Sequence, residues 1–188
     1  MRDLSLHILD IAENSIAAKA TRIEIRLEEK RELNRFVLEI RDDGTGMDKD
    51  MLNRVLDPFM TTKTTRRFGL GLPLLAQAAR AANGRLTVES EPGRGTCVRA
   101  DFELDHIDLK PLGDIPQTLA ILIMGYPEVD IVYLHKAGPS QYELDTRKIK
   151  AELDGVPIQS PDVIAVIKQD IKEGLEEIRR QNEPRKSH

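Results

Sequence analysis

The chain has 188 residues, of which 40% are hydrophobic and 32% are charged, and its formal net charge is −4 at pH 7. This composition supplies enough apolar surface for a buried core, and the negative charge gives no support to a nucleic-acid or acidic-membrane role. The only cysteine, Cys97, excludes an internal disulfide framework, and no cluster of cysteine and histidine indicates zinc. No apolar run is long enough to span a bilayer and the N-terminus has no signal-peptide pattern, so we expect a soluble cytoplasmic protein.

The first predicted element is an amphipathic helix over residues 3–18. Its core-facing stripe recurs at spacings of three and four residues and consists of Leu4, Ile8, Ile11 and Ser15. His7, Asp10 and Asn14 recur at similar spacings on an adjacent face, so we expect their side chains to point into one cleft.

Two strands are predicted next, over residues 22–28 and 36–41, because hydrophobic and charged residues alternate in both. A polar, hairpin-like loop joins them. The second strand runs into the acidic glycine turn Asp42-Asp43-Gly44-Thr45-Gly46-Met47, where Gly44 and Gly46 allow a positive φ and a close approach of the backbone to a flat ligand. A carboxylate beside such a turn can accept a hydrogen bond from an exocyclic amine, which makes Asp42 the candidate reader of adenine.

A short helix capped by Asp48 is predicted to be followed by a basic, hydroxyl-rich stretch at residues 61–67. This stretch precedes Gly69-Leu70-Gly71 and a helix over residues 72–82. Free N–H groups at a helix N-terminus favour phosphate, and Lys63, with Arg66 or Arg67 as alternatives, is the candidate phosphate clamp. The alternative interpretation of residues 61–67 is a solvated, mobile connection, which is a common kind of loop.

Strands over residues 85–90 and 96–104 complete the first part of the chain, which we interpret as a domain of residues 1–108. A change of composition predicts a linker after it, and residues 113–182 are predicted to form a small α+β module without a recognisable catalytic constellation. The apolar stripes of this module indicate packing, either on the first domain or on a partner. Its predicted elements are a helix over 114–124, strands over 129–134 and 141–144, a short helix capped by Asp145 or Thr146, and a long helix that begins at Ser160-Pro161.

Residues 3–105 resemble the GHKL ATPase superfamily, which includes gyrase B, Hsp90, histidine kinases and MutL. The resemblance rests on the order of Glu13-Asn14-Ser15, the acidic glycine turn and Gly69-Leu70-Gly71-Leu72. Residues 57–63 and 91–96 are most similar to the ATP-binding domain of a histidine kinase. The resemblance implies a two-layer α/β sandwich with a mixed sheet, the GHKL or Bergerat ATP-binding fold, with the nucleotide between the helices and a lid.

The resemblance also implies roles for individual residues. Asn14 matches the magnesium ligand of the family, Asp42 matches its adenine-reading aspartate, and Thr96 matches the threonine that supports this aspartate through water. The two glycine boxes correspond to Gly44 and Gly46 and to Gly69, Leu70, Gly71 and Leu72, of which the second lies against the phosphates. ATP and Mg²⁺ are therefore the expected cofactors.

Two departures from the family pattern bear on the activity. Asp10 stands where the hydrolysing branches of the family carry a glutamate that orients the attacking water. The side chain of Asp10 is one methylene shorter than that glutamate. Such a change shifts the attacking water by about 1 Å, so efficient hydrolysis is not expected. The first box begins almost at Met1, so we expect no dimerising hairpin with a phospho-acceptor histidine. His7 is either an acceptor that faces the cleft or a polar residue that lines the pocket.

Three functions follow as hypotheses. The first is transfer of the γ-phosphoryl group of ATP in trans to a His, Ser or Thr of a partner protein, as in a histidine kinase without its own acceptor. The second is a nucleotide-gated adaptor, similar to stand-alone anti-sigma factors, in which ATP orders the lid and creates a surface for the partner. The third, a slow ATPase, is disfavoured by Asp10. The expected partners are ATP and an unidentified protein, rather than nucleic acid or a membrane.

Overall fold

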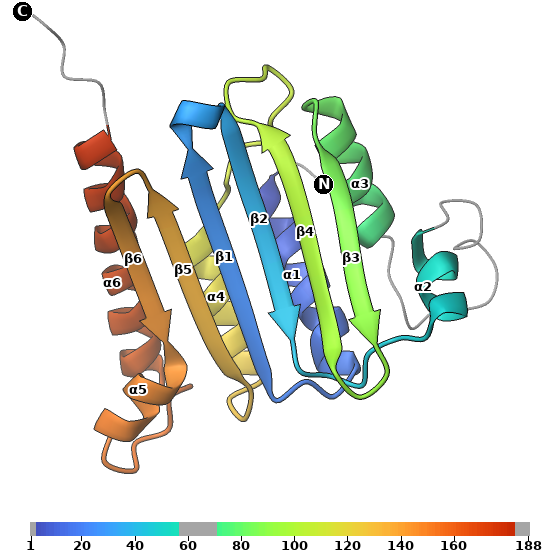
Figure 1. Cartoon of the computed structure of the whole chain (residues 1–188). Helices are drawn as coiled ribbons and strands as arrows, with labels where there is room; N and C mark the ends of the chain where they lie inside the picture. The colour runs from blue at the N-terminus through green and yellow to red at the C-terminus, as the bar shows by residue number, and fades with distance from the viewer. Residues whose placement is uncertain (1–2, 57–70, 183–188) are drawn as a thin grey trace, which may run out of the picture.

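The computed structural model describes residues 3–56 and 71–182, which build one six-stranded sheet. Its strands are β1 (Arg22–Lys30), β2 (Arg35–Asp42), β3 (Arg85–Glu91), β4 (Gly95–Glu103), β5 (Asp130–Ala137) and β6 (Ser140–Asp145). Their order across the sheet is β3-β4-β2-β1-β5-β6 (Figure 1). Only β1 and β5 are parallel neighbours, and the other neighbours are antiparallel. The sheet is therefore mixed, as predicted.

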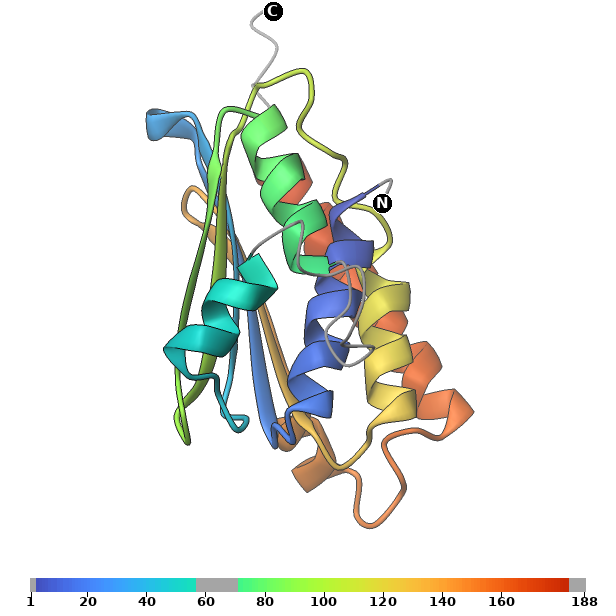
Figure 2. The same cartoon turned by 90° about the vertical axis from the view of Figure 1, so that its right-hand side faces the viewer.

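The helices form a second layer on one face of this sheet (Figure 2). The layer consists of α1 (Leu4–Ala17), α3 (Gly71–Ala81), α4 (Ile115–Gly125) and α6 (Pro161–Asn182). Two shorter helices lie beside it: α2 (Lys49–Leu56) contacts α3 and β3, and α5 (Thr146–Glu152) follows β6. The predicted two-layer α/β sandwich is confirmed. None of the helices described is both long and apolar enough to cross a membrane.

Side chains and a turn set the helix boundaries where the sequence predicted. Asp48 accepts a hydrogen bond from the N–H of Met51 at 2.8 Å, and Asp145 accepts one from the N–H of Arg147 at 3.0 Å. Both residues are thus N-caps. At the end of α3, Asn83 has a φ of +50° and the N–H of Gly84 donates to the carbonyl of Ala79 at 2.8 Å. This left-handed turn satisfies a carbonyl at the helix end.

The first hairpin is longer than predicted. Glu29 and Lys30 still pair with Phe36 and Arg35, so β1 reaches Lys30. The predicted polar loop shrinks to a short 3-10 helix, Arg31–Leu33. A charged residue on the open face of a sheet costs little, which is why the loss of apolar alternation did not end the strand.

Residues 113–182 continue the same sheet and core. Ile131 and Tyr133 of β5 stand opposite Ile23 and Ile25 of β1, and all four side chains are fully buried. The apolar stripes of the second part therefore pack on the first part, which was one of the two alternatives. That residues 1–108 and 113–182 are separate domains stays a prediction, and the truncation described in the Discussion tests it.

The segment between the two parts also holds the start of α1. The N–H of Leu4 donates to the carbonyl of Pro111 at 2.9 Å, and the N–H of Ser5 donates to the carbonyl of Leu112 at 2.8 Å. The first N–H groups of a helix have no partner within the helix. The segment that follows β4 supplies the missing acceptors.

Candidate functional site

The centre of the candidate site is the carboxylate of Asp42, at the end of β2. Its Oδ1 accepts hydrogen bonds from the N–H of Gly44 at 2.9 Å and from the N–H of Thr96 at 3.2 Å. Its Oδ2 accepts a hydrogen bond from the hydroxyl of Ser15 at 2.6 Å. Donors from three separate segments therefore hold this carboxylate in one orientation.

Asp42 retains capacity for a ligand. A carboxylate oxygen can accept two hydrogen bonds, and Oδ2 accepts one from the described residues. The side chain is only half-buried, so a donor can reach it from outside. This geometry suits an N–H donor such as the exocyclic amine of adenine.

Two hydroxyl residues that the sequence did not single out support the site. Ser15 is 4% exposed and bonds Asp42, although its position in the apolar stripe indicated only a core residue. Ser90 accepts from the N–H of Met47 at 2.8 Å, and its Oγ lies 2.9 Å from Oγ1 of Thr96. A polar residue in an otherwise apolar stripe was the available signal for Ser15.

The glycines of the acidic turn are required by neighbouring backbone. Gly46 has a φ of +65°, as predicted, whereas Gly44 does not have a positive φ. A Cβ at Gly46 would lie 2.0 Å from the carbonyl oxygen of Glu91. At Gly44 a Cβ would lie 2.8 Å from the carbonyl oxygen of Ala18. The close approach that these glycines permit in this structure is thus to the β3–β4 turn and to the end of α1.

Asp10 and Asn14 lie one turn apart on α1, next to the start of α3. A Cβ at Gly71 would lie 1.7 Å from Oδ2 of Asp10, so the Asp10 carboxylate rests directly on the first residue of α3. Among the described residues Oδ2 of Asp10 is buried without a hydrogen-bond partner, and burial raises the pKa of this carboxyl. Unpaired buried polar atoms cost about 1–3 kcal/mol and gather at functional sites.

Several predicted site residues cannot be placed. Lys63, Gly69 and Leu70 lie outside the described residues, so their roles stay predictions. The side chain of Asn14 is half-buried and makes no hydrogen bond to a residue that the structure describes. Its amide oxygen is available to a cation. Leu72 follows Gly71 in the first turn of α3 and packs against the core.

His7 is not a surface residue. It is 2% exposed, and burial lowers its pKa from 6.5 to about 4. A phospho-acceptor must be reachable by the γ-phosphate of a bound nucleotide, which a closed-in imidazole is not. The structure favours the second alternative, in which His7 is a packed polar residue near the site.

The neutral His7 predicts a pH dependence of stability. The depressed pKa means that the unfolded chain binds a proton more readily between pH 6.5 and pH 4, so the contribution is full above pH 6.5 and is lost as the pH falls toward 4. His7→Leu should make the decrease in unfolding free energy between pH 7 and pH 4.5 smaller by about 2 kcal/mol. Urea unfolding of both proteins at several pH values measures this. Parallel pH profiles would contradict the buried, neutral imidazole.

Comparison with known proteins agrees with this geometry. A model of the family described as "Histidine kinase-, DNA gyrase B-, and HSP90-like ATPase" matches residues 2–106, more than half of the chain. The chain belongs to this family. The predicted superfamily is thereby confirmed, and the matched residues include α1, the acidic glycine turn and the start of α3.

Individual relatives are sensor kinases. The chain is 38% identical over 110 residues to the sensor protein kinase FleS of Pseudomonas aeruginosa, an alignment that covers 58% of this chain and 27% of FleS. It is 36% identical over 90 residues to the sensor histidine kinase YxdK of Bacillus subtilis, covering 46% of this chain and 27% of YxdK. The chain thus aligns with about a quarter of the length of these kinases.

The fold is shared more widely. The N-terminal domain of a DNA repair protein superposes with a TM-score of 0.50 at 18% identity, over 77% of this chain and 52% of that domain. This likeness concerns the fold alone. The family and the sensor-kinase relatives together give the chain an ATP-binding role of the histidine-kinase type.

Proposed function

We propose that the chain binds Mg²⁺ and ATP between α1, the acidic glycine turn and the start of α3, and transfers the γ-phosphoryl group to a His, Ser or Thr of a partner protein. The observation that carries the proposal is the Asp42 carboxylate, which three donors orient and whose Oδ2 keeps room for one more. An acceptor at this place favours the amine of adenine and repels the carbonyl of guanine.

The residues at the end of α1 fit a hard cation. Mg²⁺ prefers oxygen ligands, and the amide oxygen of Asn14 would hold it. One turn away lies Oδ2 of Asp10, which has no hydrogen-bond partner among the described residues. The bound ion would supply neutralisation of phosphate charge. Lys63, Arg66 or Arg67, in the basic stretch of residues 61–67, is the proposed clamp on the phosphates.

The position of Asp10 supports slow hydrolysis. Its carboxylate already touches Gly71, so the longer glutamate of the hydrolysing branches has little room in the same orientation. The short side chain of Asp10 therefore allows α1 and α3 to approach each other closely. This packing favours transfer of the γ-phosphoryl group to a partner over hydrolysis of the nucleotide.

A nucleotide-gated adaptor is the second candidate. It is supported by residues 113–182, which add helices and two strands to the ATP-binding part and present a further surface to a partner. In an adaptor, ATP would strengthen the complex without phosphorylating the partner.

Labelling with γ-³²P ATP separates the candidates. A kinase in trans should turn over little ATP alone and should label its partner, and Asn14→Ala should abolish labelling because the cation loses its ligand. Asn53→Ala, the same substitution at an exposed position of α2, is the control and should label normally. An unlabelled partner whose complex is tightened by ATP would indicate the adaptor. Fast hydrolysis by the isolated chain would contradict both.

A further inference from the structure

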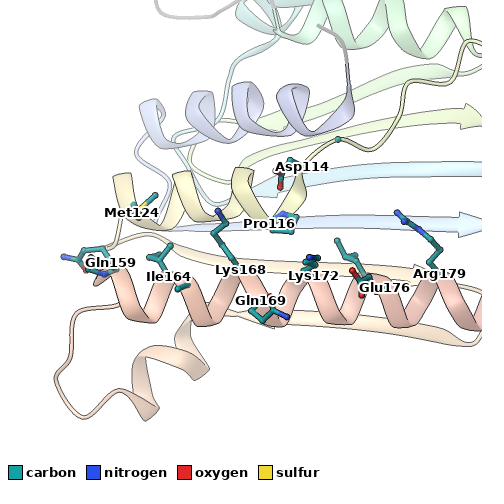
Figure 3. A pocket seen from close by; sticks show the side chains of 14 residues that line it. Asp114, Pro116, Met124, Gln159, Ile164, Lys168, Gln169, Lys172, Glu176 and Arg179 are labelled. Atoms are coloured by element: carbon teal, nitrogen blue, oxygen red, sulfur yellow. The ribbon is translucent and has the colours of Figure 1, made fainter.

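An open groove of about 970 Å³ runs between α4 and α6 (Figure 3). Its apolar part includes Pro116 and Met124 of α4 and Ile164 and Leu175 of α6. Met124 is 44% exposed, so the groove presents apolar surface to solvent. Among the residues that the structure describes, none of the nucleotide site lines this groove, and the lining lies outside the part of the chain that matches the ATPase family.

Three positively charged side chains line the groove. Lys168, Lys172 and Arg179 of α6 line it, and none of them lies within 4 Å of a carboxylate among the described residues. Lys168 donates to the neutral side chain of Gln117 at 2.7 Å and points from α6 toward α4.

The two acidic residues of the groove are already engaged. Glu176 pairs with Arg180 at 3.3 Å, on the neighbouring side of α6. Asp114 caps α4 by accepting from the N–H of Gln117 at 2.9 Å. With Glu176 paired to Arg180, three cations face the single charge of Asp114, so the apolar groove is locally positive on a chain of net charge −4.

We propose that this groove docks an amphipathic helix of a partner protein, with its apolar stripe on Met124 and Leu175 and an acidic edge along Lys168, Lys172 and Arg179. The lining of α6 runs from Pro161 to Arg179, which is about 27 Å at the helical rise and matches a helix of about 18 residues. Lys172 follows Lys168 by about one turn and Arg179 follows by about two more, so carboxylates at similar spacings on a docked helix can meet all three.

The distribution of charge argues for a helix rather than a polyanion. The cations form one narrow row, whereas exposed carboxylates of Asp170, Glu173 and Glu177 lie on the rest of α6. A nucleic acid or an anionic membrane is attracted to broad positive surfaces, and these carboxylates would repel it. A helix with one acidic edge needs only the row. The proposal does not depend on nucleotide and goes beyond the function proposed above.

A charge-exchange experiment with the full chain tests it. The probe is a fluorescein-labelled helical peptide of about 18 residues with a leucine stripe and glutamates spaced to match the three cations, and its counterpart has lysines in place of the glutamates. In low salt the glutamate peptide should bind at least about tenfold more tightly, and added salt should weaken it. Lys172→Glu combined with Arg179→Glu should reverse the preference, because both side chains are exposed and the substitutions reverse their charge.

Matched variants control for general charge effects and for folding. Lys49→Glu combined with Arg54→Glu, on exposed positions of α2, changes the net charge equally and should leave the preference intact. Met124→Ser should weaken binding of the glutamate peptide. Equal binding of the two peptides, or a preference that survives the reversal on α6, would overturn the proposal. ATP affinity, measured in parallel, should be the same in all variants, so failure here is distinct from failure of the nucleotide site.

Discussion

Asp42→Asn should lower the affinity for Mg·ATP by about 5- to 150-fold, which corresponds to the 1–3 kcal/mol of an unmet buried polar group. Oδ1 accepts from two backbone N–H groups, so the amide oxygen of the asparagine must take its place. The amide nitrogen then replaces Oδ2 and directs a donor at the donor amine of adenine. The Ser15 hydroxyl can rotate to accept instead, so the fold should survive the change.

Asp43→Asn is the matched control, one residue further along the chain. Asp43 accepts from the N–H and the hydroxyl of Thr21 at 2.8 and 2.6 Å and from the N–H of Arg22 at 2.9 Å. Burial raises the pKa of Asp43, but these hydrogen bonds outweigh it and hold the pKa below its ordinary value. Its contribution to stability is therefore present above the unfolded pKa and is lost as the pH falls through the folded value.

The two substitutions should thus separate binding from stability. Asp43→Asn should lower the unfolding free energy and leave ATP affinity of the folded protein near that of the wild type. Calorimetric titration with Mg·ATP and Mg·GTP, together with urea unfolding, measures both quantities. An Asp42→Asn variant with wild-type ATP affinity would contradict the assignment of Asp42 as the residue that binds adenine.

Ending the chain after Asp108 should abolish stable folding. The truncation removes β5, so β1 loses its parallel neighbour along the strand and pairs only with β2. It also removes α4, which packs on α1, and the carbonyls of Pro111 and Leu112 that satisfy the start of α1. Each large buried side chain contributes about 1.5–3 kcal/mol, so losing several exceeds the 5–15 kcal/mol by which a domain is stable.

Circular dichroism and a proton–nitrogen NMR spectrum of the truncated chain measure this outcome. A chain that lacks only residues 183–188 is the control and should unfold like the full chain. A truncated chain with dispersed signals and full ATP affinity would contradict the single-sheet account. Residues 1–108 would then be a separate domain.

Local patterns predicted most elements but not how the two parts of the chain join. The helix at residues 3–18 and its stripe follow from periodicity, and the structure differs by only one residue at each end. The parallel pairing of β1 with β5 was not predictable, because alternation within a strand reports which side chains are buried and not which strand lies alongside. The sequence therefore predicted the second part as a separate module, which stays a prediction until the truncation tests it.

The candidate site shows the same division. The spacing of Asp10 and Asn14 placed them on one face of α1, and Asp42 followed from the end of a strand beside glycines. The donors that orient Asp42 were not predictable, because the N–H of Thr96 reaches it only through the register of β2 and β4, in which Thr96 stands opposite Asp42. The role of Ser15 was not predictable for a related reason, since its hydroxyl reaches Asp42 only because β2 packs against α1.

The most direct test of the central claim is an NMR titration of the full chain with Mg·ATP, with the backbone amide signals assigned. The account predicts the largest shifts at Asn14, Gly44, Gly71 and Thr96, and unchanged signals at Lys168 and Lys172 in the α4–α6 groove. Shifts gathered along residues 161–179, with the acidic glycine turn unaffected, would contradict it and place the nucleotide in the groove instead.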